Sequence, residues 1–359
     1  MNEQLFNLWA RVSYFLQDFA LYLTIIIFSL CAVIFLSYQI FKSHMSDGKK
    51  KALVALYFTF LSFVMVYSGF EAYFRYRFDE SDSLGFLKVN ARWYKRHIVF
   101  NNFFYRDRNF EEKKKDGVTR IGVFGDSIAM GYGIKDTNNR FSNLLEKKLK
   151  DAQHNVEVYN LGVSGYGTKQ ELDDYEKTKH LNFDIVIWEY FLNDAEPAEE
   201  SAGTRVILKE KWQGKLVSFL SQYSYFLDYV YWRLAARYEN TFRELRNVDM
   251  ESYKDPENFK RHKKDVEDFI KELQADNKKF IIVIFPFLYS LPSYPALDIH
   301  KTITAIFKEH GVEYIDMLDD LKDKQASDVT VSRFDYHPNE YVQRLVADKL
   351  YDKIVPLLK

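Results

Sequence analysis

The chain has 359 residues, of which 47% are hydrophobic and 28% are charged, and this mixture excludes a mainly disordered protein. Its 50 Lys and Arg residues against 51 Asp and Glu residues give a net charge of −1, which excludes the basic surface of a nucleic-acid-binding protein. Cys31 is the single cysteine, which excludes an intramolecular disulfide and a metal site built from cysteines.

Two uncharged runs near the N-terminus predict membrane-spanning helices. Residues 19–41 and 52–70 contain no Asp, Glu, Lys or Arg. At about 1.5 Å per residue, each run is long enough to cross a hydrocarbon core of about 30 Å. A cleavable signal peptide fits the first run poorly, because no basic segment precedes it and no small-residue cleavage site follows it. Buried helices of a soluble protein are the other interpretation. We therefore predict a membrane anchor over residues 1–75, with the lipid bilayer as a partner.

The link between the two runs, residues 42–51, sets the expected orientation. It carries four lysines, whereas the N-terminal tail carries a single arginine. The positive-inside rule then places the link in the cytoplasm and both outer segments outside it. Basic residues beyond the second run, Arg75, Arg77 and Lys88, weaken this bias. Residues 1–18 have aromatic side chains among polar ones, the composition of an amphipathic interfacial helix.

The rest of the chain alternates strand and helix patterns. Helical patterns cover residues 141–149 and 339–358, and the capping-box spacing of Thr168 to Glu171 predicts another helix start. This alternation indicates right-handed crossovers and a parallel sheet that is covered on both faces. The predicted fold class is α/β, a flavodoxin-like three-layer sandwich with a five-stranded parallel sheet. Short apolar runs predict its strands at residues 120–124, 156–161, 184–190, 280–285 and 312–315.

One stretch interrupts the alternation. Residues 196–278 carry no strand signal, and we interpret them as a helical insertion. Its aromatic-rich part, residues 219–242, is either an amphipathic helix that covers the core or a surface for a partner or the membrane. The expected organisation is the membrane anchor, a stalk and wrapping segment over residues 76–117, and an α/β domain over residues 118–359 that contains the insertion.

Polar residues follow four of the predicted strands. In an open parallel sheet, ligands bind beyond the carboxyl ends of the strands, so these residues are expected to converge on one rim. The four segments are Gly125-Asp126-Ser127, residues 160–168, Leu192-Asn193-Asp194 and residues 335–339, which read Asp-Tyr-His-Pro-Asn.

Each of these segments has a chemical interpretation. The hydroxyl of Ser127 is a weak nucleophile until an imidazole, here that of His337, takes its proton. Asp335 is placed to fix the tautomer of that imidazole. Attack on an ester carbonyl creates an oxyanion, which needs preorganised donors. We expect them to be the backbone N–H groups of Ser127 and Gly165 and the side-chain amide of Asn193.

These segments together resemble the four sequence blocks of the SGNH (GDSL-type) hydrolase family, which contribute a serine, a glycine, an asparagine and a histidine. The resemblance covers about residues 118–358, with the blocks in the family's order. It implies a serine ester hydrolase or O-acyltransferase, with acetyl as the commonest acyl group. Two departures stand out: Leu192 replaces a frequent glycine, and Asp335 lies two residues before His337 instead of three.

Other interpretations of the same residues stay open. Ser127 is also a candidate N-cap, Asn193 is a candidate cap of the first helix of the insertion, and Asp335 is a candidate cap of the final helix. Gly165 suits a turn whatever its function. Ser164 is a rival nucleophile, although no Gly-x-Ser-x-Gly elbow surrounds it.

Cofactor motifs are missing from the sequence. There is no phosphate-binding loop, no complete dinucleotide fingerprint and no His-Glu-x-x-His metal helix. We therefore predict an enzyme with no cofactor and no metal.

The leading hypothesis is a membrane-anchored serine esterase or O-acyltransferase, with its catalytic domain in the periplasm or outside the cell. It would act on a cell-envelope glycan or a lipid-linked acyl acceptor through an acyl-enzyme on Ser127. By analogy alone, an integral-membrane acyl donor protein is a candidate partner. The alternative is a non-catalytic assembly subunit of an envelope polysaccharide modification complex.

Overall fold

The computed structural model describes residues 3–195, 215–234 and 237–358. The chain divides into two compact units. The first comprises Met1–Phe78 with Ser224–Phe226, and the second comprises Asp79–Tyr223 with Leu227–Lys359.

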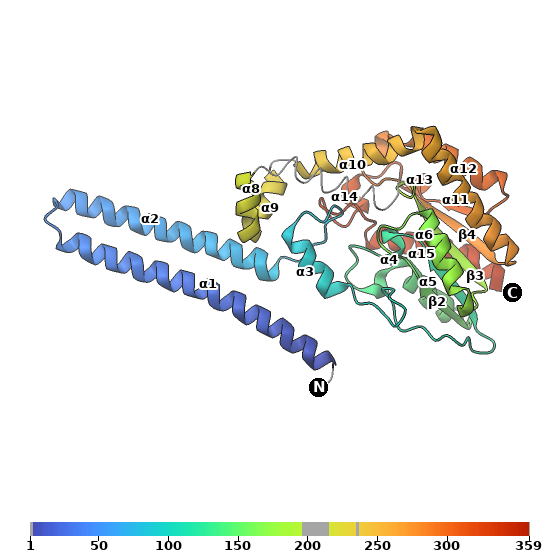
Figure 1. Ribbon diagram of the computed structural model, residues 1–359, viewed down its shortest axis with the longest axis horizontal. Helices are drawn as coiled ribbons and strands as arrows, with labels where there is room; N and C mark the ends of the chain where they lie inside the picture. Colours follow the sequence, from blue (N-terminus) through green and yellow to red (C-terminus); the bar gives the residue numbers. More distant parts are fainter. Residues whose placement is uncertain (1–2, 196–214, 235–236, 359) are drawn as a thin grey trace. The chain divides into compact units, whose positions relative to one another are not determined.

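Two long helices make up most of the first unit (Figure 1). They are α1 (Glu3–Lys42) and α2 (Asp47–Ala72), and one turn of π-helix (Tyr73–Arg77) follows α2. The stretches Leu23–Lys42 and Asp47–Arg77 are long and apolar enough to cross a membrane. They contain most of the two uncharged runs, so the structure offers two candidate spans where the sequence predicts them.

Large apolar side chains point outward on both helices. Phe28 of α1 is 75% exposed and Phe63 of α2 is 68% exposed. Water disfavours such an arrangement, whereas hydrocarbon accepts it. The helix α1 begins at Glu3 and continues without a break, so the segment with the composition of an interfacial helix is helical and forms the beginning of α1.

The second unit is built on a parallel five-stranded sheet. The strand order is β2-β1-β3-β4-β5, the doubly wound flavodoxin-like order, which confirms the predicted fold class. Every predicted strand is present, although the fifth begins two residues later than expected. The backbone N–H of Val312 donates to the carbonyl of Phe307, so Val312 closes the preceding helix instead of opening the strand. The strands are β1 (Thr119–Phe124), β2 (Val156–Asn160), β3 (Ile185–Phe191), β4 (Lys279–Phe285) and β5 (Tyr314–Asp316).

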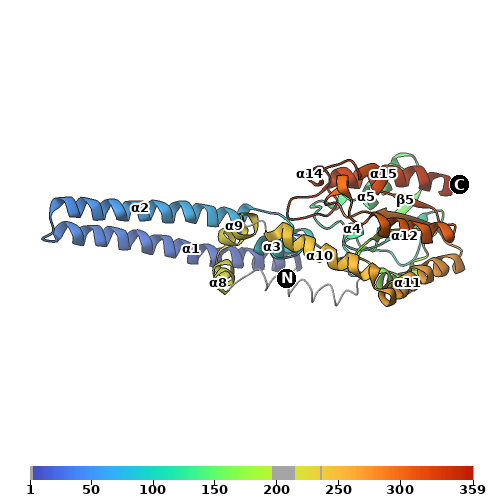
Figure 2. The ribbon, with the colours of Figure 1, turned by 90° about the horizontal axis from the view of Figure 1, so that it is seen from above.

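Helices cover both faces of this sheet (Figures 1 and 2). One face carries α5 (Phe141–Asp151) and α15 (Glu340–Ile354), and the other carries α6 (Thr168–Thr178), α11 (Pro256–Ala275) and α12 (Leu297–Glu309). Successive strand residues point to opposite faces. Val123 therefore joins the core under α5 and α15, whereas Trp188 packs its ring 4.6 Å from that of Phe269 in α11.

Two helix ends differ in detail from the expectation. The helix α6 begins at Thr168 as predicted, but its N-cap is Gly167, and the side chain of Gln170 reaches back to accept the N–H of Gly167 at 2.9 Å. The last α-helix, α15, ends at Ile354 and gives way to a 3-10 turn, because Pro356 lacks the N–H that would continue it.

The described part of the insertion is helical, as predicted. It comprises α8 (Lys215–Tyr223), α9 (Tyr225–Leu234), α10 (Arg237–Lys254) and α11, and residues 196–214 of the predicted range lie outside the described residues. Trp232, Tyr238 and Phe242 are buried, so this part of the aromatic stretch covers the core. The large apolar residues of α8 are exposed instead.

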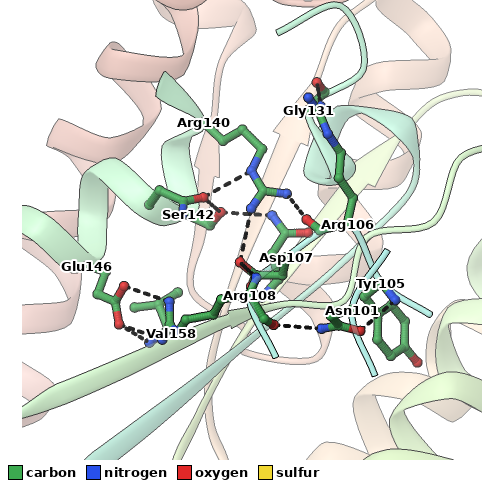
Figure 3. A network of polar contacts seen from close by, with 12 residues as sticks. Asn101, Tyr105, Arg106, Asp107, Arg108, Gly131, Arg140, Ser142, Glu146 and Val158 are labelled. Atoms are coloured by element: carbon green, nitrogen blue, oxygen red, sulfur yellow. Dashed lines mark hydrogen bonds and ion pairs between the residues drawn. The ribbon is translucent and has the colours of Figure 1, made fainter. Parts of the chain in front are cut away.

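A network of buried arginines connects the segment before β1 with the loop that follows α4 (Ser127–Met130) through hydrogen bonds (Figure 3). Nη1 of Arg106 donates to the carbonyl of Gly131 and Nη2 donates to that of Ile134, each at 2.6 Å. Arg140 donates to the carbonyl of Arg106 and pairs with Asp107 at 3.3 Å. Both arginines are fully enclosed, and buried charges are stable only with such partners. The network thereby fixes the loop that follows α4 (Ser127–Met130).

Candidate active site

Ser127 stands at a sharp turn between β1 and α4. Its neighbour Asp126 is the N-cap of α4 and accepts the N–H of Ile128 at 2.7 Å, so the interpretation of Ser127 as the cap is wrong. Gly125 has a φ of 155°, and a Cβ there would lie 2.5 Å from a carboxyl oxygen of Glu189. A glycine is therefore required where the chain turns. As the first residue of α4, Ser127 has a backbone N–H with no partner inside the helix.

Ser127, His337 and Asp335 form one chain of hydrogen bonds. Nε2 of His337 lies 2.9 Å from Oγ of Ser127. Nδ1 of the same ring lies 2.5 Å from Oδ1 of Asp335. The ring of Tyr132 packs 4.9 Å from the imidazole and restricts its tilt. With one nitrogen held by a carboxylate, the other nitrogen faces the serine as an acceptor, which is the arrangement of a general base.

The short spacing between Asp335 and His337 is accommodated by the backbone. Oδ1 of Asp335 accepts the backbone N–H of His337 at 3.1 Å as well as its ring nitrogen. The final helix is capped by Asn339, whose side chain accepts the N–H groups of Tyr341 and Val342. The interpretation of Asp335 as the cap of that helix is therefore wrong.

Two serines from the segment before the α/β domain complete the surroundings of Asp335. Ser81 donates to Oδ2 of Asp335, and Ser83 donates to Oδ1 at 3.0 Å. Ser83 Oγ also accepts the N–H of Tyr336 at 2.7 Å. Burial of Asp335 pushes its pKa upward, but His337 and Ser81 outweigh this effect and hold the pKa below its usual value. The carboxylate is thus kept charged although it is fully enclosed.

The predicted oxyanion donors lie around the same space. Gly165 and Asn193 line one pocket together with Ser127 and His337. Gly165 has a φ of 84°, which favours glycine, and a Cβ added there would meet no atom within 4 Å. Nδ2 of Asn193 donates to Asp126 at 3.3 Å, which leaves its second hydrogen for a ligand. The structure thus brings all five predicted site residues together.

The pocket itself is small and mixed in character. Its volume is about 130 Å³, and its wall includes Ser164, Phe242 and Arg246. The guanidinium of Arg246 lies 5.1 Å from the ring centre of Phe242, and its Nη1 is 2.6 Å from a carboxyl oxygen of Asp249. Ser164 lines the same pocket, but the imidazole of His337 contacts Ser127.

Buried carboxyl groups lie behind the nucleophile turn. Glu189 in β3 accepts the N–H groups of Asp126 at 3.1 Å and Ala129 at 3.3 Å, and thereby ties both sides of Ser127 to the sheet. Glu171 accepts the indole N–H of Trp188 at 2.7 Å. Burial, and then the neighbouring carboxyls, raise the pKa of Glu171 and Glu189 well above the usual value. The same causes act on Asp194, which follows Asn193. Within the described residues, no group of three or more His, Cys, Asp or Glu side chains is arranged to hold a metal.

Sequence reasoning did not find three of these contributors. Ser81 and Ser83 belong to a segment without regular structure, and only the polar run Asp79 to Ser83 hints at a role. Glu189 lies in a strand whose other residues are apolar or aromatic. A single carboxyl in such a strand is the sequence signal that could have pointed to a role for it.

A family model matches the part of the chain that carries this site. Residues 123–345 match the model of the GDSL-like Lipase/Acylhydrolase family, and this range includes all five predicted site residues. No curated protein matches the chain. Similar solved structures include TesA, which is 15% identical, with 67% of this chain and 99% of that chain covered at a TM-score of 0.42. The psychrotrophic esterase EstA from Pseudoalteromonas sp. is 18% identical, with 67% of this chain and 98% of that chain covered at a TM-score of 0.41. The lipase/acylhydrolase from Enterococcus faecalis is 16% identical, with 67% of this chain and 97% of that chain covered at a TM-score of 0.43.

Proposed function

Because the chain belongs to the GDSL-like lipase/acylhydrolase family, we propose that it is a membrane-anchored serine esterase or O-acyltransferase that works outside the cytoplasm. The observation that carries the proposal is the hydrogen-bonded chain from Ser127 through His337 to Asp335, at 2.9 Å and 2.5 Å. Serine hydroxyls need such a base before they attack an ester.

The first half of the reaction acylates the enzyme. Oγ of Ser127 attacks the ester carbonyl while its proton passes to Nε2 of His337. The carbonyl oxygen becomes an oxyanion, which the N–H groups of Ser127 and Gly165 and the amide of Asn193 stabilise. When the tetrahedral intermediate collapses, the bond to the alcohol breaks and His337 returns the proton to the leaving oxygen. Asp335 stabilises the imidazolium while it carries that proton.

The second half transfers the acyl group to a hydroxyl. His337 takes a proton from the incoming water or sugar hydroxyl, whose oxygen attacks the acyl-Ser127 carbonyl. When the tetrahedral intermediate collapses, the bond to Oγ of Ser127 breaks and His337 returns the proton to that oxygen. With water the enzyme is an esterase, and with a glycan hydroxyl it is an O-acyltransferase. The pocket volume of about 130 Å³ lies well below the roughly 300–1,000 Å³ of sites for drug-sized ligands. This size supports a short acyl group such as acetyl.

The anchor gives the proposal its substrate class. Two helices that suit a membrane precede the catalytic domain, so its substrates are expected within reach of the bilayer. We infer a cell-envelope glycan or a lipid-linked acyl acceptor, and an integral-membrane acyl donor protein as a partner.

The test uses the full-length protein in detergent. Wild type and Ser127→Ala are incubated with 4-nitrophenyl acetate, alone and with envelope-type oligosaccharides, and the products are identified by mass spectrometry. If wild type releases acetate, Ser127→Ala does not, and no acetylated oligosaccharide forms, the result supports an esterase. Acetylated oligosaccharide in the wild-type reaction supports a transferase. Folded wild type that turns over no faster than Ser127→Ala would contradict the enzyme and favour a scaffold.

The orientation needs its own test. A reporter enzyme that is active only in the periplasm is fused after Lys359. We expect activity, because the lysines between α1 and α2 favour the cytoplasm. A reporter that works only in the cytoplasm would overturn both the orientation and the envelope substrate.

A further inference from the structure

The helix α8 carries an exposed apolar face. Leu216 is 70% exposed, Phe219 is 58% exposed and Leu220 is 41% exposed, and Tyr223 on the same face is also largely exposed. These positions are spaced i, i+3, i+4 and i+7, so their side chains lie within an arc of about 100° around the helix. Water disfavours an apolar face of this kind, and such faces mark contact with a protein or a membrane.

The opposite side of α8 is already held by the protein. Ser221 is 5% exposed, and the ammonium group of Lys88 donates to the carbonyl of Gln222. The backbone N–H of Lys88 also donates to Asp228 of α9 at 2.8 Å, so both helices are fastened to the start of α3 (Lys88–His97). Turning the apolar face inward would break these contacts. Among the residues that the structure describes, the face of Leu216, Phe219 and Leu220 is therefore left largely uncovered.

The residues directly after α8 pack against the end of the second candidate span. Ser224 donates to a carboxyl oxygen of Glu71 at 2.6 Å and accepts the hydroxyl of Tyr67 at 2.9 Å. The backbone N–H groups of Tyr225 and Phe226 each donate to Glu71 at 3.0 Å. The side chain of Glu71 thus satisfies the first N–H groups of α9 in place of a cap within α9 itself.

Aromatic and charged neighbours locate this contact along α2. The ring of Phe226 stacks on Phe70 at 5.0 Å. Phe70 is the last residue of the uncharged run, and Glu71 is paired with Arg75 at 3.0 Å. The change from an uncharged run to paired charges marks the depth at which a span meets the lipid headgroups. One peptide bond connects Ser224, at this depth, to the end of α8.

We propose that α8 is an interfacial helix that lies on the same bilayer as the anchor, with the face of Leu216, Phe219, Leu220 and Tyr223 in lipid. The covalent link to a segment held at the headgroup depth, and the apolar face of the adjacent helix, select the lipid surface over a protein partner. The proposal rests on the membrane anchor of the proposed function and not on catalytic activity. It extends the anchor from two spanning helices to a third element that lies flat on the membrane.

Site-directed spin labelling tests this placement. The full-length chain with Cys31→Ser is reconstituted into vesicles of phosphatidylethanolamine and phosphatidylglycerol. A nitroxide is attached at Phe219→Cys on the apolar face, or at Ser218→Cys, an exposed position on the opposite side of α8, as the matched control. Collisions with oxygen, which concentrates in lipid, are compared with collisions with a water-soluble nickel chelate. Leu220→Cys gives a second position on the apolar face.

We expect collisions with oxygen to dominate at positions 219 and 220 and collisions with the nickel chelate to dominate at position 218. Dominance of the nickel chelate at 219 and 220 would place the face in water and overturn the proposal. Exclusion of both reagents there would mean that a protein or a second copy covers the face, which would also overturn it. Because the readout is spectroscopic, a failure here is distinct from a failure to hydrolyse esters.

Discussion

Asp335 and His337 are separated by a single residue, yet Oδ1 of Asp335 lies 2.5 Å from the ring nitrogen Nδ1 of His337. The same oxygen accepts the backbone N–H of His337 at 3.1 Å. Side chain and backbone of His337 therefore converge on one carboxyl oxygen, which fixes the ring with its other nitrogen toward Ser127. A longer spacing is not needed to build this contact.

This relationship predicts a graded loss of activity. Ser127→Ala and His337→Ala should each lower kcat by on the order of 10⁶-fold, because the two residues act as a unit. Asp335→Asn should cost less, about 10⁴-fold, because an amide favours the wrong tautomer of the imidazole but leaves the ring in place. Turnover of 4-nitrophenyl acetate by the three variants checks this. Wild-type turnover by Asp335→Asn would reduce the machinery to a Ser127–His337 pair.

The serines beside Asp335 are positioning residues with a measurable signature. Ser81→Ala removes a donor that lowers the pKa of Asp335. We expect kcat/KM to fall by about tenfold, or about 1.4 kcal/mol, and the acid limb of its pH profile to move to higher pH. Ser327→Ala, an exposed serine, is the control. An unchanged profile in Ser81→Ala would show that Ser81 does not influence the carboxylate.

Asn193 is expected to act on the oxyanion. Asn193→Ala should lower the acylation rate by about 10²–10³-fold, the usual cost of one missing donor. Folding should change little, since its one described hydrogen bond is a long contact of 3.3 Å with Asp126. Ser164→Ala, which alters the same pocket, should retain its rate. Burst kinetics measure acylation directly, and a full rate in Asn193→Ala would leave the residue with a structural role alone.

The buried carboxyls predict stability that depends on pH. The folded-state pKa values of Glu171 and Glu189 are raised, so their contribution is fully present below about pH 4.5 and is lost as the pH rises through the folded values. The free energy of unfolding should therefore fall as the pH rises above about 4.5. Glu171→Gln resembles the protonated acid, so it should flatten the dependence and melt higher than wild type at pH 8. Thermal unfolding in detergent from pH 4 to 8 measures this, and parallel curves would contradict it.

The sheet could be predicted because its strands are short apolar runs between helical patterns. The parallel arrangement of the strands followed from their regular alternation with helices, whereas the ends of the elements depended on particular contacts. Thr168 was expected to cap its own helix, but Gly167 does so, because Gln170 reaches back to the N–H of Gly167. Likewise, Val312 belongs to the turn after α12, since its N–H donates to the carbonyl of Phe307. Hydrophobic periodicity does not indicate which group a backbone N–H binds at the end of a helix.

The site residues could be predicted because each follows a strand at the same rim. The residues that hold them in place could not be predicted, because they come from distant parts of the chain. Ser81 precedes Asp335 by 254 residues, and no spacing rule links them. Glu189 is part of β3 and reaches the turn at Asp126 only because β1 and β3 are neighbours in the sheet. Contacts of this kind depend on the three-dimensional neighbourhood of strands.

The central claim is that Ser127 is a nucleophile activated by His337. The most direct measurement is labelling of the detergent-solubilised, full-length protein with a fluorophosphonate, followed by mass spectrometry of its peptides. We predict one adduct, on Ser127, that is lost in His337→Ala while Ser164→Ala is labelled like wild type. An adduct on Ser164, or no adduct on well-folded wild-type protein, would contradict the claim.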